Sequence, residues 1–191
     1  LLERAAHADL LYLSGITLSL FDEAGQARLR ALARTVRARG GRVAFDTNYR
    51  PRGWAGPEAA RAAVTAFAPL VDIALPTLSD DVVLYDDPDP PACAARWLAA
   101  GASVVAVKMG EAGVLLATPQ DHRHLPPPRV VAPRDTTGAG DSFNGAFIAA
   151  LLTGESFEDA VAAGQRLAAA VIAHPGAVIP AAAMPAAATP A

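Results

Sequence analysis

Short apolar runs alternate with longer segments of helical periodicity along nearly the whole chain, and this alternation limits the fold more than any other feature. Runs such as "RVAFD" (42–46) and "SVVAV" (103–107) are short and apolar, which predicts buried strands. Segments such as 23–39 and 57–67 carry apolar residues at helical spacing, which predicts helices between those strands. Strands that alternate with helices form α/β folds, so we expect a mainly parallel sheet flanked by helices.

Length and composition exclude several classes of function. The 191 residues carry a net charge of −3 with scattered basic residues, so no nucleic-acid partner is expected. No stretch approaches the roughly 18 apolar residues of a membrane helix, so no membrane partner is expected. One cysteine, Cys93, allows neither an internal disulfide nor a zinc cluster, and no signal peptide is recognisable. We therefore expect a cytoplasmic domain over residues 1–180 and a loose Ala/Pro-rich tail over 181–191.

The stretch "RDTTGAGDSFNGAF" (134–147) places small residues and one carboxylate, Asp141, at the start of a predicted helix. The first turn of a helix presents unpaired N–H groups and the positive end of the helix dipole, which bind anions. Glycine and alanine let a phosphate approach the backbone, and a neighbouring carboxylate could take a proton from an attacking hydroxyl. For an isolated acid, a favourable contact with the dipole would be the simpler explanation.

Two other phosphate motifs are excluded by their spacing. A dinucleotide fingerprint requires glycine where Phe143 stands, and a P-loop requires Lys-Ser or Lys-Thr after its last glycine.

"DTTGAGDSFNGAF" resembles the C-terminal signature of the ribokinase-like (PfkB) carbohydrate kinases. The resemblance implies a three-layer α/β/α fold and an enzyme that uses ATP with Mg²⁺. It also implies that Gly138, Ala139, Gly140 and the Asp141 amide form an anion hole for the transferring phosphoryl group. The Asp141 carboxylate would be the general base that activates the sugar hydroxyl and would thus touch the substrate.

"VVAVKMGEAG" (104–113) is similar to the nucleotide-side strand and turn of the same family. The resemblance implies that Lys108, Gly110 and Gly113 line the ATP site. Lys108 is the only lysine in a chain whose other basic residues are arginines. An ordinary hairpin with turn glycines remains the alternative.

"FDTNYRPRGW" (45–54) resembles the strand-end segment of the family branch that phosphorylates 2-keto-3-deoxygluconate, and "YLSGITLSL" and "HPGAVIP" are also similar to that branch. Arg50 can offer a planar fork of donors to a carboxylate, which a neutral sugar would not require. The resemblance implies that Arg50 contacts the substrate acid and ATP, that Asn48 lines the nucleotide side, and that Ile16 touches the substrate. A surface ion pair is the alternative for Arg50.

The chain departs from the family pattern in two places. "PTLSDD" puts Thr77 and Asp80 where the family has an Asn-x-x-Glu element that helps to hold Mg²⁺ and phosphate, so we assign no residue as a metal ligand. The resemblance covers only about the C-terminal two thirds of a complete member. We therefore expect the N-terminal strands and the lid over the substrate to be lacking.

These observations predict a carbohydrate kinase that phosphorylates 2-keto-3-deoxygluconate at its terminal hydroxyl, giving the 6-phosphate. The alternatives are another PfkB sugar kinase, such as a fructokinase, a ribokinase or a kinase of a different keto-deoxy sugar acid, and a non-catalytic nucleotide-binding remnant. The sequence leaves the existence of a homo-oligomer open.

Overall fold

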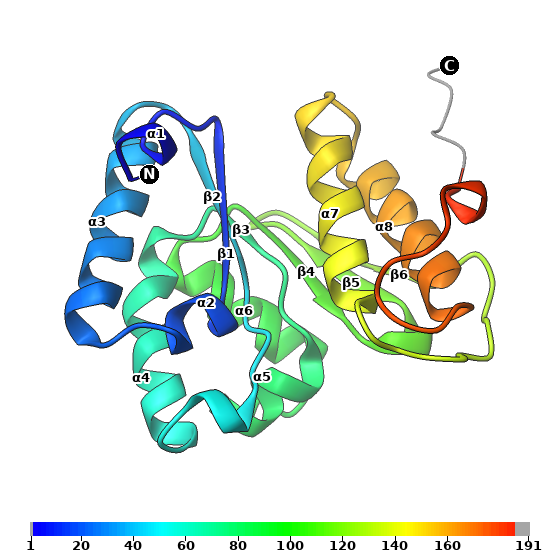
Figure 1. The fold of residues 1–191 in the computed structure, drawn as a ribbon, viewed down its shortest axis with the longest axis horizontal. Helices are drawn as coiled ribbons and strands as arrows, with labels where there is room; N and C mark the ends of the chain where they lie inside the picture. Colours follow the sequence, from blue (N-terminus) through cyan, green and yellow to red (C-terminus); the bar gives the residue numbers. More distant parts are fainter. Residues whose placement is uncertain (1, 186–191) are drawn as a thin grey trace. The chain divides into compact units, whose positions relative to one another are not determined.

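The computed structural model describes residues 2–185 of the chain, which divide into two compact units (Figure 1). Unit 1 contains residues 2–109 and 117–122, and unit 2 contains residues 110–116 and 123–185. In this described part of the chain, no helix has both the length and the apolar character needed to cross a membrane.

Unit 1 is built on parallel strands that follow one another across the sheet in chain order, namely β1 (Leu10–Ser14), β2 (Arg42–Asp46), β3 (Ile73–Ala74) and β4 (Val104–Lys108). Helices fill the connections between them: α3 (Glu23–Ala38), α4 (Pro57–Phe67), α5 (Leu78–Tyr85) and α6 (Pro90–Ala100). Crossovers between parallel strands are right-handed, and all of these advance in one direction, so α3, α4 and α6 cover one face. The expected parallel arrangement is therefore confirmed for these strands.

Aromatic side chains fix the centre of unit 1. Phe45 of β2 lies 5.1 Å from Phe67 of α4 and 6.0 Å from Trp97 of α6, measured between ring centroids. All three side chains are fully buried. Because tilted aromatic pairs add to the free energy gained from burial, this cluster anchors both helices on the middle of the sheet.

Neighbouring backbone groups lie close to the ends of β1 and β3. β1 ends at Ser14, whose side chain caps the short helix α2 (Gly15–Ser19) by accepting the Thr17 N–H. A Cβ atom on Gly15 would clash with the Thr47 carbonyl oxygen, so glycine lets α2 approach the segment after β2. β3 has only two residues, Ile73–Ala74, and an isolated parallel bridge between Thr77 and Lys108 lies beyond Pro76.

Unit 2 contains most of the strands β5 (Val114–Ala117) and β6 (His122–Leu125) and the packed helices α7 (Ala139–Leu152) and α8 (Phe157–Ile172). Gly164 of α8 lies against the ring of Phe143, where a Cβ atom would come within 2.6 Å. The remaining elements among residues 2–185 are α1 (Leu2–Ala5) and the 3-10 turns η1 (Pro51–Gly53), η2 (Ala68–Leu70), η3 (Gly110–Ala112) and η4 (Ala181–Ala183). Of the predicted tail, residues 186–191 lie outside the described residues.

Candidate functional site

The site residues predicted in unit 1 follow the carboxyl ends of its parallel strands. Ligands of α/β sheets bind outside this edge of the sheet. Ile16 follows β1, Asn48 and Arg50 follow β2, and Lys108 ends β4. The site residues that the sequence predicted in unit 1 therefore belong to segments that meet at the carboxyl edge of the sheet.

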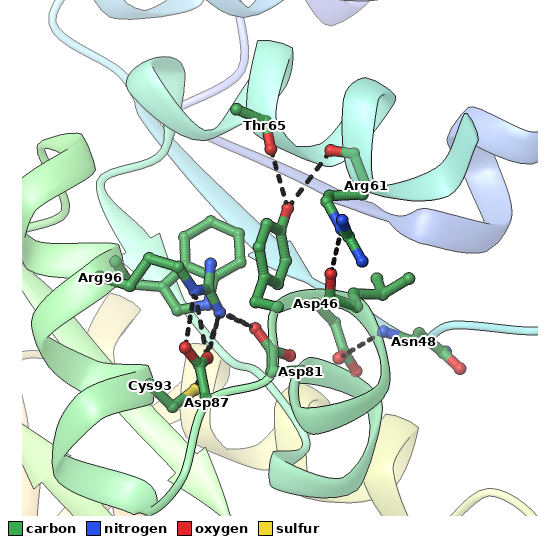
Figure 2. Close-up of polar contacts among 11 residues, drawn as sticks. Asp46, Asn48, Arg61, Thr65, Asp81, Asp87, Cys93 and Arg96 are labelled. Carbon is green, nitrogen blue, oxygen red and sulfur yellow. Dashed lines mark hydrogen bonds and ion pairs between the residues drawn. The ribbon is translucent and has the colours of Figure 1, made fainter. Parts of the chain in front are cut away.

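A buried ion pair joins two of these strand ends. Lys108 Nζ lies 2.8 Å from Asp46 Oδ2, and the two residues are 7% and 2% exposed. Asp46 Oδ1 also accepts the Asn48 N–H at 3.1 Å, which Figure 2 shows. This bond holds Asn48 in a left-handed conformation with φ of 33°. The sequence reasoning missed Asp46, although a carboxylate at one strand end and the only lysine at another were the available signal.

The predicted role of Lys108 at ATP stays a prediction, because its ammonium group contacts Asp46 in this structure. A buried charge is costly unless it is paired, so this contact alone gives the lysine a structural role.

Arg50 and Asp80 both form hydrogen bonds with the backbone of Tyr49, the residue that follows Asn48. The Tyr49 N–H donates to Asp80 Oδ2 at 3.0 Å, and Arg50 Nη1 donates to the Tyr49 carbonyl oxygen at 2.8 Å. Burial raises the pKa of the Asp80 carboxyl, and the hydrogen bond from Tyr49 opposes this shift. The Arg50 side chain is 60% exposed, which leaves its guanidinium accessible to an anionic ligand.

A buried charge network joins the first turn of α5 to α6. Arg96 contacts Asp81 and lies 2.8 Å from Asp87, as Figure 2 shows, and Trp97 Nε1–H donates to Asp81 Oδ1 at 3.0 Å. Burial raises the pKa of Asp81, while the charge of Arg96 lowers it. Among the described residues, Asp81, Asp87 and Cys93 form the one group with metal-ligand spacing. The guanidinium already supplies the positive charge there, and burial raises the pKa of the Cys93 thiol, so we assign no metal to it.

In unit 2, the signature glycines begin α7 as the sequence predicted. Gly138 is the N-cap in a left-handed conformation with φ of 77°, and no side chain caps the helix. The Ala139 N–H donates to the Thr136 carbonyl oxygen at 3.2 Å, and the first bond of the helix runs from Ser142 N–H to Gly138. The amides of Gly140 and Asp141 therefore have no acceptor within the helix.

The start of α7 fits a phosphate group. The exposed Asp141 side chain belongs to the same first turn as those two amides, and the residues around it are small. Backbone N–H groups at a helix N-terminus recognise phosphate oxygens directly. The assignment of Ala139 to the anion hole stays a prediction, since its amide is occupied by Thr136 in this structure.

Hydrogen bonds to the Asp135 carboxylate stabilise the segment that leads into α7. Its Oδ1 accepts the Thr137 N–H at 2.9 Å and the Thr137 hydroxyl at 2.7 Å, and its Oδ2 accepts the Gly176 N–H at 2.7 Å. These hydrogen bonds lower the pKa of Asp135 to about 2. The sequence reasoning did not assign a role to Asp135, because its partner Gly176 lies 41 positions away.

Gly110 and Gly113 have left-handed backbones, with φ of 60° and 91°. A Cβ atom on Gly113 would also clash with the Leu125 carbonyl oxygen. Both glycines are therefore required by the turn itself, and their proposed contact with ATP stays a prediction.

A family model described as pfkB family carbohydrate kinase matches residues 1–184. The 2-dehydro-3-deoxygluconokinase of Escherichia coli K12 is 40% identical over 184 residues, covering 93% of this chain and 59% of its own length. The corresponding protein of Dickeya dadantii is 39% identical over 182 residues, covering 93% of this chain and 58% of its own length.

Among solved structures, a putative ribokinase II from Escherichia coli in complex with ATP and Mg²⁺ superposes with a TM-score of 0.80. It is 26% identical, and the match covers 92% of this chain and 56% of that one. The predicted ribokinase-like three-layer α/β/α fold is thereby confirmed. The chain spans less than two thirds of the length of each of these proteins.

Neutralising one member of the Asp46–Lys108 pair should destabilise the protein strongly. We expect Asp46→Asn and Lys108→Met each to lower the free energy of unfolding by about 3–5 kcal/mol, because each removes the opposite charge from a buried ion pair. The double variant should recover much of that loss. Denaturant unfolding of the three variants measures this. Glu23→Gln serves as the control, with an effect of about 0–1 kcal/mol, because the Glu23 side chain that pairs with Arg30 is 81% exposed. Losses that simply add in the double variant would contradict the coupling.

The hydrogen bonds to Asp135 predict an acid-shifted titration. Because its pKa is lowered from 3.8 to about 2, the carboxylate stabilises the folded state above pH 3.8 and loses that effect as the pH falls toward 2. The difference in stability between the protein and Asp135→Asn should therefore narrow over that range. NMR titration of the Asp135 carboxyl carbon measures the midpoint directly, and a midpoint near 3.8 would show that the contacts are absent in solution.

Proposed function

Because the chain belongs to the pfkB family of carbohydrate kinases, we propose that it forms the nucleotide-binding and catalytic part of an ATP-dependent kinase of 2-keto-3-deoxygluconate, the compound also called 2-dehydro-3-deoxygluconate. The product would be the 6-phosphate. The observation that carries this proposal is the start of α7, where an exposed carboxylate shares one helical turn with two amides that lack an intrahelical acceptor.

The terminal hydroxyl of the sugar acid attacks the γ-phosphoryl group in line, and Asp141 accepts the proton of that hydroxyl. The bond between the γ-phosphorus and the β,γ-bridging oxygen breaks, and ADP leaves. The amides of Gly140 and Asp141 donate to the phosphoryl oxygens as negative charge develops on them. Mg²⁺, when bound with ATP, would neutralise charge on the phosphates. Position 138 requires glycine, because its backbone is left-handed and a Cβ atom there would come within 2.6 Å of Ala177 Cβ.

Arg50 supports an acidic substrate. It stands at the carboxyl edge of the unit 1 sheet, and most of its side chain is exposed. A guanidinium binds a carboxylate through two parallel hydrogen bonds, which a neutral sugar cannot offer. Ile16 is the second residue of α2, which lies next to this segment because Gly15 packs on the Thr47 carbonyl group. In the proposal, Ile16 supplies an apolar contact for the substrate. Asn48 and Lys108 are the nucleotide-side residues of the proposal.

Replacing Asp141 tests the general base. We expect Asp141→Asn to lower kcat by about 10²–10⁴-fold, because the amide cannot accept the proton from the hydroxyl. The affinity for ATP should change little, as measured by calorimetry. Glu158→Gln is the control, since Glu158 is a partly exposed acid in the first turn of another helix, paired there with Arg123, and it should retain normal kcat. A near-normal kcat in Asp141→Asn would refute the base assignment.

Replacing Arg50 tests the substrate class. We expect Arg50→Ala to raise KM for the sugar acid by about 10–100-fold, the loss expected for hydrogen bonds to a charged group, and to leave KM for a neutral sugar unchanged. Arg52→Ala, an exposed arginine two positions away, should leave both constants unchanged. Turnover of fructose or ribose in place of the acid would favour another sugar kinase of the family. ATP binding without any turnover would favour the nucleotide-binding remnant.

A further inference from the structure

Asp80 and Arg50 bind the two backbone polar groups of Tyr49, its N–H and its carbonyl oxygen. Asp80 Oδ2 accepts the Tyr49 N–H at 3.0 Å, and the Tyr49 carbonyl oxygen accepts from Arg50 Nη1 at 2.8 Å. The same Nη1 atom lies 4.0 Å from Asp80 Oδ2. These contacts close a small ring of interactions that joins the first turn of α5 to the segment after β2.

The charges around Asp80 favour its contact with Arg50. The Asp80 side chain is only 18% exposed, and the carboxylates of Asp46 and Asp81 add negative charge near it. Arg50 is the cation that opposes this charge at Asp80. The Arg50 guanidinium is therefore attracted toward Asp80, in the first turn of α5.

The first turn of α5 is itself held firmly. Asp81, the next residue, is fully buried and contacts both Arg96 and the indole N–H of Trp97. Arg96 also stacks on Tyr85 at 3.7 Å, so it ties the end of α5 to α6. Moving this turn would leave the buried Asp81 charge unpaired, which is costly. The contacts of Asp81 thus fix the helical turn that carries Asp80.

Both contacts of the Arg50 guanidinium use the same nitrogen, Nη1. A guanidinium has five N–H donors in a fixed plane, so an arginine anchored through Nη1 still offers Nη2 and Nε to a ligand. A carboxylate can take both of these donors in a bidentate contact.

We propose that Asp80 is a positioning residue that orients Arg50, so that the edge of its guanidinium formed by Nη2 and Nε meets the carboxylate of the substrate. This inference rests on the proposed function, in which the substrate is a sugar acid. It gives Asp80 a task different from that of the Asn-x-x-Glu element whose place it takes, because here its oxygen is directed at Tyr49 and Arg50.

Two substitutions separate the parts of this arrangement. Asp80→Asn keeps an oxygen that accepts the Tyr49 N–H but removes the charge facing Arg50, whereas Asp80→Ala removes both. We expect KM for the sugar acid to rise about threefold in the first variant and about tenfold in the second, with kcat, KM for a neutral sugar and the Mg²⁺ requirement unchanged. Asp86→Asn, at the exposed left-handed end of the same helix, is the matched control and should change none of these constants.

A double variant shows whether Asp80 acts through Arg50. In an Arg50→Ala background, adding Asp80→Ala should produce no further rise in KM, because the residue to be positioned is already missing. An additional rise would overturn the inference. A lower acid KM in Asp80→Asn would also overturn it, since Asp80 would then compete with the substrate for Arg50. An Asp80 variant that changes only the Mg²⁺ requirement would also overturn the inference.

The failure of this inference is distinguishable from that of the proposed function. If Arg50→Ala raises the acid KM and neither Asp80 variant does, the inference is wrong and the acid site stands. If Arg50→Ala itself has no effect on the acid KM, both the acid site and the inference are wrong.

Discussion

The buried ion pair between Asp46 and Lys108 is the interaction on which the unit 1 site depends. It joins the ends of β2 and β4 across the short strand β3, at the edge where ligands of parallel sheets bind. The second oxygen of Asp46 then sets the backbone of Asn48, and the chain leaves the strand in the direction that brings Tyr49 to α5 and Arg50 to solvent. One buried charge pair thus determines the course of the segment that carries the proposed acid-binding residue.

The two units build their sites by different physical means. Unit 1 uses side chains, with charges that are paired and supported by a second network around Asp81 and Arg96. Unit 2 uses backbone, since the α7 start offers amides and depends on glycine at position 138 and on the Asp135 hydrogen bonds to stay in place. The difference suits the proposed ligands. A carboxylate on a small sugar is recognised by the planar guanidinium of arginine, whereas a phosphoryl group is recognised by N–H groups that surround it.

Much of the fold was predictable from the sequence because helix and strand periodicities are strong here. The bounds of β2 and α4 agree with the predicted segments, and the "GAGD" turn begins a helix as expected. The contacts that shape the site were not predictable. Asp46 and Lys108 are 62 positions apart, and Asp135 and Gly176 are 41 apart, so only the folded chain brings them together.

The central claim is that the amides at the start of α7 bind the transferring phosphoryl group. Backbone NMR of the protein with ADP, aluminium fluoride, Mg²⁺ and the sugar acid tests it most directly, because this mixture imitates the phosphoryl group in transfer. The account predicts that the Gly140 and Asp141 amide resonances shift strongly when the complex forms and that ADP alone shifts them much less. Binding of the complete mixture with both resonances unmoved would contradict it.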